Sequence, residues 1–160
     1  MSLLLKNSLW MNVQKRARLQ EEVATWLEGR ADDYTHAVTT TFEDEPSNID
    51  EAETVFARFQ NYLNKECFRR PKSADDKVKM AVVLEGVRTN RRLHYHCAMR
   101  APDKLSPQEF GRRIKKAWRK AVRSGEARVD VQAYRKGWLP YMTKELGFTN
   151  TDGISKHNNF

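Results

Sequence analysis

The sequence predicts an α+β fold of the split β-α-β class, with two helices on one face of a four-stranded antiparallel sheet and the other face open. Two observations predict it. Four short segments have the alternation or the β-branched composition of strands, and two segments repeat apolar residues at helical spacing. They follow one another in the order β-α-β-β-α-β, with one helix before and one after, and 160 residues suit one domain.

The first half of the chain supplies a helix, a strand and a second helix. Residues 9–29 carry an imperfect apolar stripe among charged residues, which favours a helix. Residues 34–42, YTHAVTTTF, are rich in threonine, valine and aromatic residues, which is typical of a strand. Ser47 and Asn48 then cap a helix with apolar residues at 3.6-residue spacing. These apolar residues are Ile49, Ala52, Val55, Phe56, Phe59, Tyr62 and Leu63.

Two strands joined by a polar turn come next and predict an antiparallel hairpin. In residues 78–86 the even positions are apolar, and in residues 92–100, RLHYHCAMR, the odd positions are apolar. Side chains two residues apart on a strand share a face. Glu85, His94 and His96 are therefore expected together on the side of the hairpin that faces away from the core.

The last part of the chain supplies a helix, a strand and a short helix. Ser106 as N-cap, Pro107 at the first position and Glu109 completing a capping box mark the start of the third helix. One side of this helix is apolar, and the other is basic from Arg112 to Arg123. Residues 129–133 alternate as a strand, and a short helix is expected from Pro140 to Gly147. The complete order is that of the ferredoxin-like fold.

Composition and charge restrict the class of function. A hydrophobic fraction of 39% indicates a folded protein, and without an apolar run of 18 residues we expect no transmembrane helix and no membrane partner. The start MSLLLKNSLWMN is too short and too polar for a secretory signal. Cys67 and Cys97 are expected as reduced thiols of a cytoplasmic protein. The net charge of +8 favours a polyanionic partner, of which nucleic acid is the commonest.

The predicted outer side of the hairpin gathers one carboxylate and two imidazoles. Such ligands, with open coordination positions, suit a divalent cation that also binds substrate oxygens. The alternative is an incidental pair of surface histidines beside a glutamate. Both interpretations stay open on the residues alone.

The stretch YMTKE supplies a second group of candidates. Tyr141 and Lys144 are three residues apart on the last helix and therefore neighbours on one side of it. Tyrosine is almost wholly neutral at pH 7, so as a nucleophile it needs a metal on the phosphate and a cation near the phenolate. Lys144 is placed to be that cation. The plainer alternative is a core tyrosine beside a surface lysine.

The stretches HAVTTTF, LHYHC with Glu85 upstream, and YMTKE follow one another in this order. In this combination the chain resembles the HUH endonucleases, and more closely the nicking domain of rolling-circle replication initiators (Rep proteins) with a single catalytic tyrosine. The resemblance spans roughly Tyr34 to Leu146. It divides the chain into an N-terminal helical extension (1–33), the nicking domain (34–147) and a flexible tail (148–160).

The resemblance implies a site-specific endonuclease that nicks and rejoins single-stranded origin DNA. Glu85, His94 and His96 would hold Mn²⁺ or Mg²⁺, which polarises the scissile phosphate. Tyr141 would attack that phosphate, leaving a 5′-phosphotyrosine bond and a free 3′-hydroxyl that primes replication. Lys144 would position or activate the tyrosine.

The outward face of the sheet also offers candidate DNA contacts. Arginines would hold backbone phosphates, and one unstacked base could lie on Tyr134, which is also the rival nucleophile but lacks a lysine at the matching offset. The basic side of the third helix is expected to be a solvated surface, with remote duplex contact as the functional alternative. The candidate DNA-binding residues are Thr39, Thr41, Arg92, Arg100, Arg128, Gln132 and Tyr134.

The resemblance also implies partners and a location. They are single-stranded DNA or an origin hairpin, with a host helicase and polymerase, in the cytoplasm of a cell that carries a plasmid, phage or other mobile element. No G-x-x-x-x-G-K phosphate loop occurs in the sequence, so a chain complete as given would depend on a host helicase or on extruded hairpin DNA. An excised domain would fit equally.

Other classes of function stay open. Single-tyrosine transposases share the two histidines and the late tyrosine, but usually have a glutamine near that tyrosine, where this chain has Lys144. A non-catalytic RNA-recognition-like module would stack bases on outward aromatic residues. Here the outward positions are histidine and arginine, and Tyr95 is expected to point inward. A structural zinc site would need more closely spaced cysteine or histidine.

Overall fold

The structure is a computed structural model that describes residues 3–29, 34–69, 73, 76–87, 91–146 and 153–158. In these residues the sheet has the order β2-β3-β1-β4, with every neighbouring pair antiparallel. This confirms the predicted α+β, split β-α-β fold. The elements are α1 (Leu3–Glu28), β1 (His36–Thr41), α2 (Ile49–Cys67), β2 (Met80–Glu85), β3 (His94–Met99), α3 (Pro107–Val122), β4 (Val129–Ala133) and α4 (Trp138–Met142).

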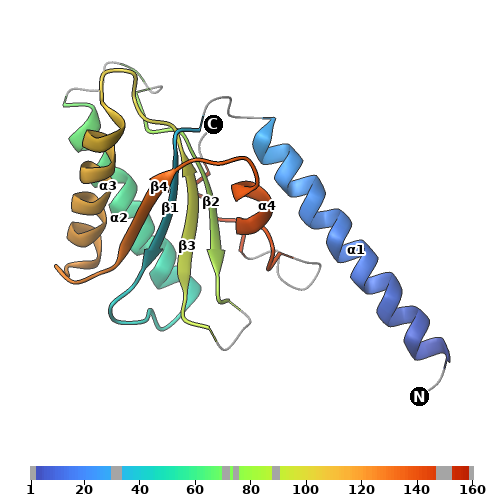
Figure 1. Ribbon diagram of the computed structural model, residues 1–160. Coiled ribbons are helices and arrows are strands. Elements are labelled where there is room, and N and C mark those ends of the chain that lie inside the picture. The colour runs from blue at the N-terminus through green and yellow to red at the C-terminus, as the bar shows by residue number, and fades with distance from the viewer. Residues whose placement is uncertain are drawn as a thin grey trace.

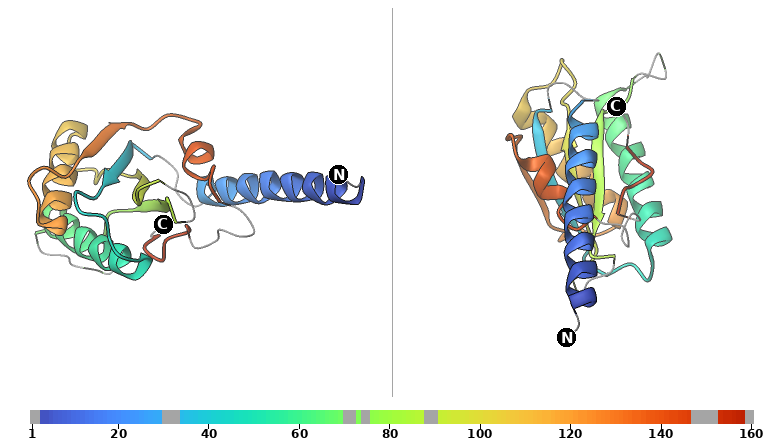
Figure 2. Two further views of the ribbon diagram at one scale, coloured as in Figure 1. Left: turned by 90° about the horizontal axis from the view of Figure 1, so that it is seen from below. Right: turned by 90° about the vertical axis from the view of Figure 1, so that its right-hand side faces the viewer.

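The sheet lies between two unequal layers. Helices α2 and α3 cover one face, and the short α4 and one end of α1 lie on the other (Figure 1). The view from below in Figure 2 shows the same order, with the rest of α1 extending away from the body. None of the helices in the described part of the chain combines the length and the apolar character needed to cross a membrane.

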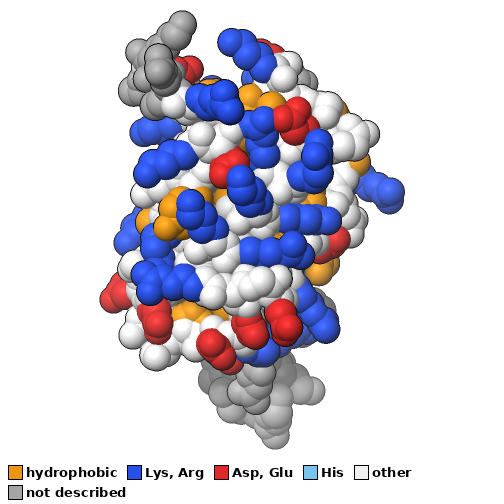
Figure 3. All heavy atoms as spheres, turned by 90° about the vertical axis from the view of Figure 1, so that its left-hand side faces the viewer, with side chains coloured by type: hydrophobic (Ala, Val, Ile, Leu, Met, Phe, Trp, Pro, Cys, Tyr) orange, Lys and Arg blue, Asp and Glu red, His pale blue; other side chains and the backbone are white. Residues whose placement is uncertain are grey.

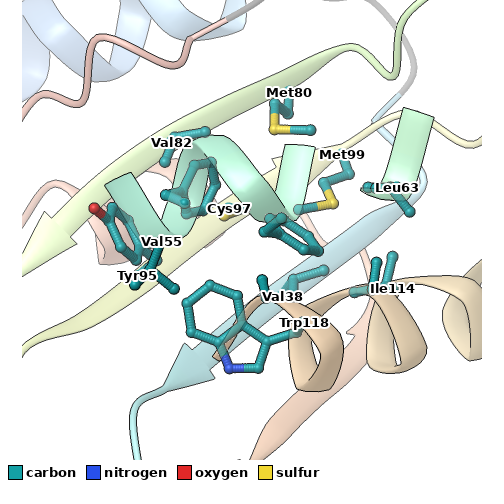
Figure 4. Close-up of a cluster of buried hydrophobic side chains, with 14 of the residues drawn as sticks. Val38, Val55, Leu63, Met80, Val82, Tyr95, Cys97, Met99, Ile114 and Trp118 are labelled. Carbon is teal, nitrogen blue, oxygen red and sulfur yellow. The ribbon is translucent and has the colours of Figure 1, made fainter. Parts of the chain in front are cut away.

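The main core fills the space between the sheet and the helices α2 and α3. The even positions of β2 and the odd positions of β3 point into it, as the alternation predicts. Trp118 of α3 is fully buried at its centre, packs on Phe42 and Phe59, and donates a hydrogen bond to the Thr41 carbonyl, 3.0 Å away (Figure 4). This core fixes which side chains of the hairpin face the other way.

Both helix caps predicted for α2 and α3 are present. The side chain of Asn48 accepts a hydrogen bond from the Glu51 amide, and that of Ser106 accepts one from the Glu109 amide, with Pro107 at the first position. The thiol of Cys97 is buried and that of Cys67 is half-buried, and both are free. Burial raises the pKa of the Cys67 thiol to about 12.

The second face of the sheet carries a smaller apolar cluster under α4 and α1. Leu139, Met142 and Leu146 pack there with Ala24 and Leu27 of α1. The Gln20 amide donates to two carbonyl oxygens after α4, that of Lys144 at 2.5 Å and that of Leu146 at 2.9 Å. The face predicted to be open is therefore covered over part of its area, and the candidate site lies beside this cover.

The last helix begins earlier and ends earlier than its composition predicts. Gly137, at φ 102°, lets the chain turn into α4 at Trp138 instead of Pro140. The hydroxyl of Thr143 donates to the carbonyl oxygen of Leu139, 3.0 Å away, and bonds of this kind compete with the helical pattern. The helix proper ends at Met142, and looser turns carry the chain on to Leu146.

Part of the segment predicted as a tail, residues 153–158, lies along the outer edge of β2. The Leu84 amide donates to the Gly153 carbonyl at 2.8 Å, and the Asn158 side chain bonds both the amide and the carbonyl of Val82. Buried Glu53 accepts hydrogen bonds from Ser155 and from Tyr95, each 2.9 Å long. This segment is fastened both to the sheet and to α2.

Candidate metal and tyrosine site

The hairpin between β2 and β3 brings the predicted ligands together. Glu85 is paired directly with His94 across the two strands, and His96 lies two residues further along β3. Gly86 ends β2 at φ 93°, and a Cβ there would come within 2.7 Å of the Arg92 carbonyl oxygen. Only glycine fits this close turn, so Gly86 fixes the end of the strand at which the three side chains meet.

One carboxylate oxygen is the centre of the group. Oε2 of Glu85 lies 3.2 Å from Nε2 of His94, 3.2 Å from Nε2 of His96 and 3.1 Å from Nζ of Lys144. Glu85 is 0% exposed, and His96 is buried. The other oxygen, Oε1, is buried and has no hydrogen-bond partner among the described residues. A buried polar atom without a partner is unfavourable, so the group is incomplete as it stands.

Both imidazoles are held through their Nδ1 atoms. Nδ1 of His94 lies 2.9 Å from the Arg92 carbonyl oxygen, which can only accept, so this nitrogen carries the proton. Nδ1 of His96 lies 2.9 Å from the Thr39 hydroxyl, which can accept in the same way. In the neutral rings each Nε2 then presents a lone pair toward Glu85. Imidazoles oriented through the far nitrogen in this way are typical of histidines that bind metals.

The proton balance of the group follows from its contacts. Burial opposes ionisation of Glu85, but hydrogen bonds from both histidines and from Lys144 outweigh it and hold the pKa of Glu85 well below its ordinary value. The hydrogen bond to Glu85 raises the pKa of His94. Burial lowers the pKa of His96 despite the same carboxylate. The group is thus an anion between one readily protonated imidazole and one neutral imidazole.

The donor set and its spacing fit a divalent cation. The three ligand atoms lie within 4.8 Å of one another. Adjacent ligands of an octahedral ion with bonds of about 2.1 Å are about 3 Å apart, close to the two 3.2 Å separations. Two imidazoles and one carboxylate with open positions suit Mn²⁺ and other first-row ions, and Mg²⁺ when substrate oxygens complete the shell. The predicted metal group is therefore present as a cluster able to hold an ion.

Tyr141 lies beside the same group and is 48% exposed. Its ring packs edge-on against His96, with centroids 5.3 Å apart, and Nζ of Lys144 lies 3.7 Å from its centroid. Lys144 thus touches both the tyrosine ring and Glu85. The structure brings together all five residues predicted for catalysis and metal binding.

Trp138 is part of this arrangement and was missed in the sequence. Its ring stacks on Tyr141 with centroids 5.3 Å apart, and its Nε1 donates to the Cys97 carbonyl at 3.0 Å. Trp138 therefore ties the tyrosine to β3. The signal was available, since Trp138 precedes Tyr141 by the same three residues that separate Tyr141 from Lys144.

Glu145 is the second residue that was missed. Its carboxylate accepts a hydrogen bond from the Gly86 amide, 3.1 Å away, and forms an ion pair with Arg91 at 3.4 Å. These contacts fasten the chain after α4 to the hairpin that carries Glu85. No signal in the sequence pointed to them, because they link residues far apart in the chain.

Four of the predicted DNA-binding residues lie near the site. Thr39 bonds His96, and the other three line a pocket of about 630 Å³ beside His94. Arg92 and Arg128 are exposed there, although Arg92 also contacts Glu43 and Glu45. These three pocket residues are Thr41, Arg92 and Arg128.

The other three predicted DNA-binding residues lie elsewhere. Arg100 follows β3 at the end away from His94, about 20 Å along the strand, and forms a 3.8 Å ion pair with Asp103. Gln132 is exposed on β4 and donates to Asp130. Tyr134 packs on Tyr34 and the apolar cluster under α4, with ring centroids 5.4 Å apart, so its ring is half-buried.

Together the fold and the site define a class: a split β-α-β protein with a buried Glu-His-His group able to hold a cation and an exposed tyrosine against it. Among protein families, the one described as replication-associated protein ORF2 matches residues 35–146. The chain belongs to this family of replication-associated proteins. Neither the comparison with curated proteins nor that with solved structures gives a match. The matched range runs from just before β1 to the end of the site segment.

Proposed function

We propose that this protein initiates replication of a small replicon by nicking and rejoining single-stranded origin DNA. Membership of a replication-associated family supports the process, and the contact between Tyr141 and the Glu85-His94-His96 group supports the chemistry. The observation that carries the proposal is Lys144, which lies between the carboxylate and the tyrosine ring.

A divalent cation held by Glu85, His94 and His96 would act as a Lewis acid on the scissile phosphate. Tyr141 is the nucleophile: its oxygen forms the bond to phosphorus, and the 3′-oxygen of the neighbouring nucleotide leaves and takes up a proton. The Lys144 ammonium, over the ring, favours the phenolate. Trp138 and His96 hold the ring in place, so little orientation is lost on binding.

The pocket beside His94 is the proposed path of the substrate strand. Arg92 and Arg128 would bind its phosphates there, with Thr41 between them. Arg100, Gln132 and Tyr134 are not part of this proposal, because they lie away from the pocket. The proposed partners are single-stranded origin DNA or its hairpin and a host helicase and polymerase, in the cytoplasm.

The test is a covalent adduct on a denaturing gel. Protein is mixed with labelled single-stranded DNA from its own replicon and Mn²⁺, and we expect a labelled band that migrates with the protein. The band should be absent with a chelator and in Tyr141→Phe, while DNA binding persists in both cases. Tyr134→Phe is the matched control and should form the adduct normally.

Either of two results would contradict the proposal. Adduct formation by Tyr141→Phe would exclude Tyr141 as the nucleophile. Binding without an adduct on any origin-derived strand would instead indicate the non-catalytic binding module. Excision of a marked element in place of origin nicking would indicate a transposase.

A further inference from the structure

The side of the molecule opposite the site carries a concentration of positive charge that the nicking reaction does not use. Helix α3 covers the face of the sheet away from Glu85, and its solvent side exposes six lysine and arginine residues. Figure 3 looks onto this side: lysine and arginine are spread over its middle, and most aspartate and glutamate lie toward its lower edge. The six are Arg112, Lys115, Lys116, Arg119, Lys120 and Arg123.

These cations form one line and are only partly neutralised. Lys116 is paired with Glu66 at 2.9 Å, and Lys120 lies over the Tyr62 ring. The side chains of Arg112, Lys115, Arg119 and Arg123 make no ion pair or hydrogen bond within the described part of the chain. We call these four residues and the exposed Arg69 the cationic track.

The track continues past the helix. Arg69 and Arg112 line a shared pocket of about 280 Å³ between α2 and α3. Arg69 also lines a second pocket of about 440 Å³ at the end of the sheet, with Lys77, Lys79 and Lys104. Cations therefore run from that end of the sheet to the end of α3. Along α3 alone the track spans about 16 Å.

Helix stability does not explain the track. Cations favour only the last turn of a helix, which accounts for Arg119 but not for Arg112 or Lys115. Like charges three or four residues apart repel and weaken a helix. Arg123 moreover occupies a left-handed C-cap, φ 59°, where glycine is usual. These features work against the fold, so an external anion is the simpler reason for them.

The chemistry of the track fits the backbone of a duplex and not an unstacked strand. Binding of single strands uses exposed aromatic rings as stacking platforms. The large exposed hydrophobic residues of the described chain are Val13, Trp26, Tyr141 and Ile154, and none of them lies on α2 or α3. A straight line of about 16 Å matches roughly five base pairs of a duplex at 3.4 Å each.

We propose that the cationic track binds double-stranded DNA through its phosphates, independently of the strand in the catalytic site. Because arginine and lysine would contact phosphates alone, the binding is independent of sequence and strongly dependent on salt. The two faces of the sheet then hold two different forms of DNA, a single strand beside His94 and a duplex along α3.

The test measures duplex binding by fluorescence anisotropy of the full chain with a chelator present, so that cleavage plays no part. Lys115→Gln/Arg119→Gln/Arg123→Gln removes three track charges, and Lys15→Gln/Arg18→Gln/Lys156→Gln removes three exposed charges elsewhere. The track variant should lose at least about tenfold in duplex affinity near 0.1 M salt, and its log–log salt slope should become shallower by roughly 2 to 3. The control variant should bind like the unchanged protein.

Two further arms separate this proposal from the nicking proposal. Binding of a single strand of equal length should be unchanged in the track variant and weakened in Arg92→Gln/Arg128→Gln, whatever happens to cleavage. Arg119→Gln alone should give about one third of the change in slope, which guards against misfolding of the triple variant. Unchanged duplex binding in the track variant, or an equal loss for single strand and duplex, would overturn the proposal.

Discussion

The Glu85 carboxylate is where the chemistry of the site is concentrated at the scale of single residues. One of its oxygens is shared by three nitrogen atoms, and the other lacks a partner among the described residues. Because His94 is the readily protonated member, a proton and a metal ion compete for its Nε2. This competition can be measured without DNA.

Binding of Mn²⁺ should release a proton and should strengthen with rising pH. The raised pKa of His94 means that its ring keeps a proton at pH values where a free histidine has begun to lose it. The apparent affinity should therefore rise from about pH 6 until the pH exceeds the pKa of His94. Calorimetry in buffers of different ionisation enthalpy would detect the proton, and its absence at about pH 6 to 7 would contradict this account.

The same pKa shift has a consequence for stability without metal, with a defined sign. Since the folded-state pKa of His94 is raised, its contribution to stability is fully present below the ordinary pKa of about 6.5 and is lost as pH rises through the folded value. Glu85 acts oppositely: its folded-state pKa is lowered, so its contribution is present above about 4.5 and is lost in acid.

Tyr95, between the two histidines, serves the core and not the site. Its hydroxyl donates to Glu53 at 2.9 Å, where Ser155 also donates. Tyr95→Phe should lower the free energy of unfolding by about 1–2 kcal/mol, because a buried hydrogen bond to a carboxylate is lost while the ring stays packed. Urea denaturation would measure this, with Tyr62→Phe as a half-exposed control that should change little. An equal loss in both variants would argue against the role of Glu53.

At the scale of secondary-structure elements, α4 is too short to be stable alone and is held by its neighbours. It spans Trp138–Met142, and its contacts are Trp138 on β3, Glu145 on the hairpin and Gln20 of α1. Most helical stability in proteins comes from such packing. The position of Tyr141 is therefore set by three other elements.

Gln20→Ala should slow adduct formation several-fold and leave Mn²⁺ affinity unchanged. The amide fixes the carbonyls of Lys144 and Leu146, so its loss loosens Lys144 without touching Glu85 or the histidines. Single-turnover adduct kinetics with calorimetry of metal binding would show this split. Gln14→Ala, at an exposed position of the same helix, is the control. A parallel loss of metal affinity would mean that Gln20 supports the whole fold.

The sequence predicted the strands of the hairpin and their facing well, because alternation is a local property. Glu85, His94 and His96 were found in this way. Arg100 shows the limit: the alternation put it on the same face as His94 but could not tell that it lies at the other end of the strand. The cover of α1 and α4 was not foreseen, since the apolar stripe of α1 is imperfect and its contacts involve residues more than 100 positions apart.

At the scale of the whole molecule, metal binding and folding are linked. An ion that binds only the folded state stabilises it by RT ln(1 + [L]/Kd), about 2.7 kcal/mol at 100-fold excess over Kd. For a domain of this size the melting temperature should rise by about 5 to 10 °C. Glu85→Gln should abolish the rise, and Glu126→Gln, an exposed control, should keep it. A rise that survives in Glu85→Gln would place the ion elsewhere.

The segment 153–158 also limits how copies of this chain can associate. It occupies the backbone groups on the outer edge of β2, where the Asn158 amide imitates a neighbouring strand. Among the described residues, no strand pairs with the outer edge of β4. A sheet with one available edge can join one other sheet and then has no edge left, whereas growth into a fibre needs two. Fastening a few C-terminal residues to β2 therefore restricts edge-to-edge assembly to a closed pair.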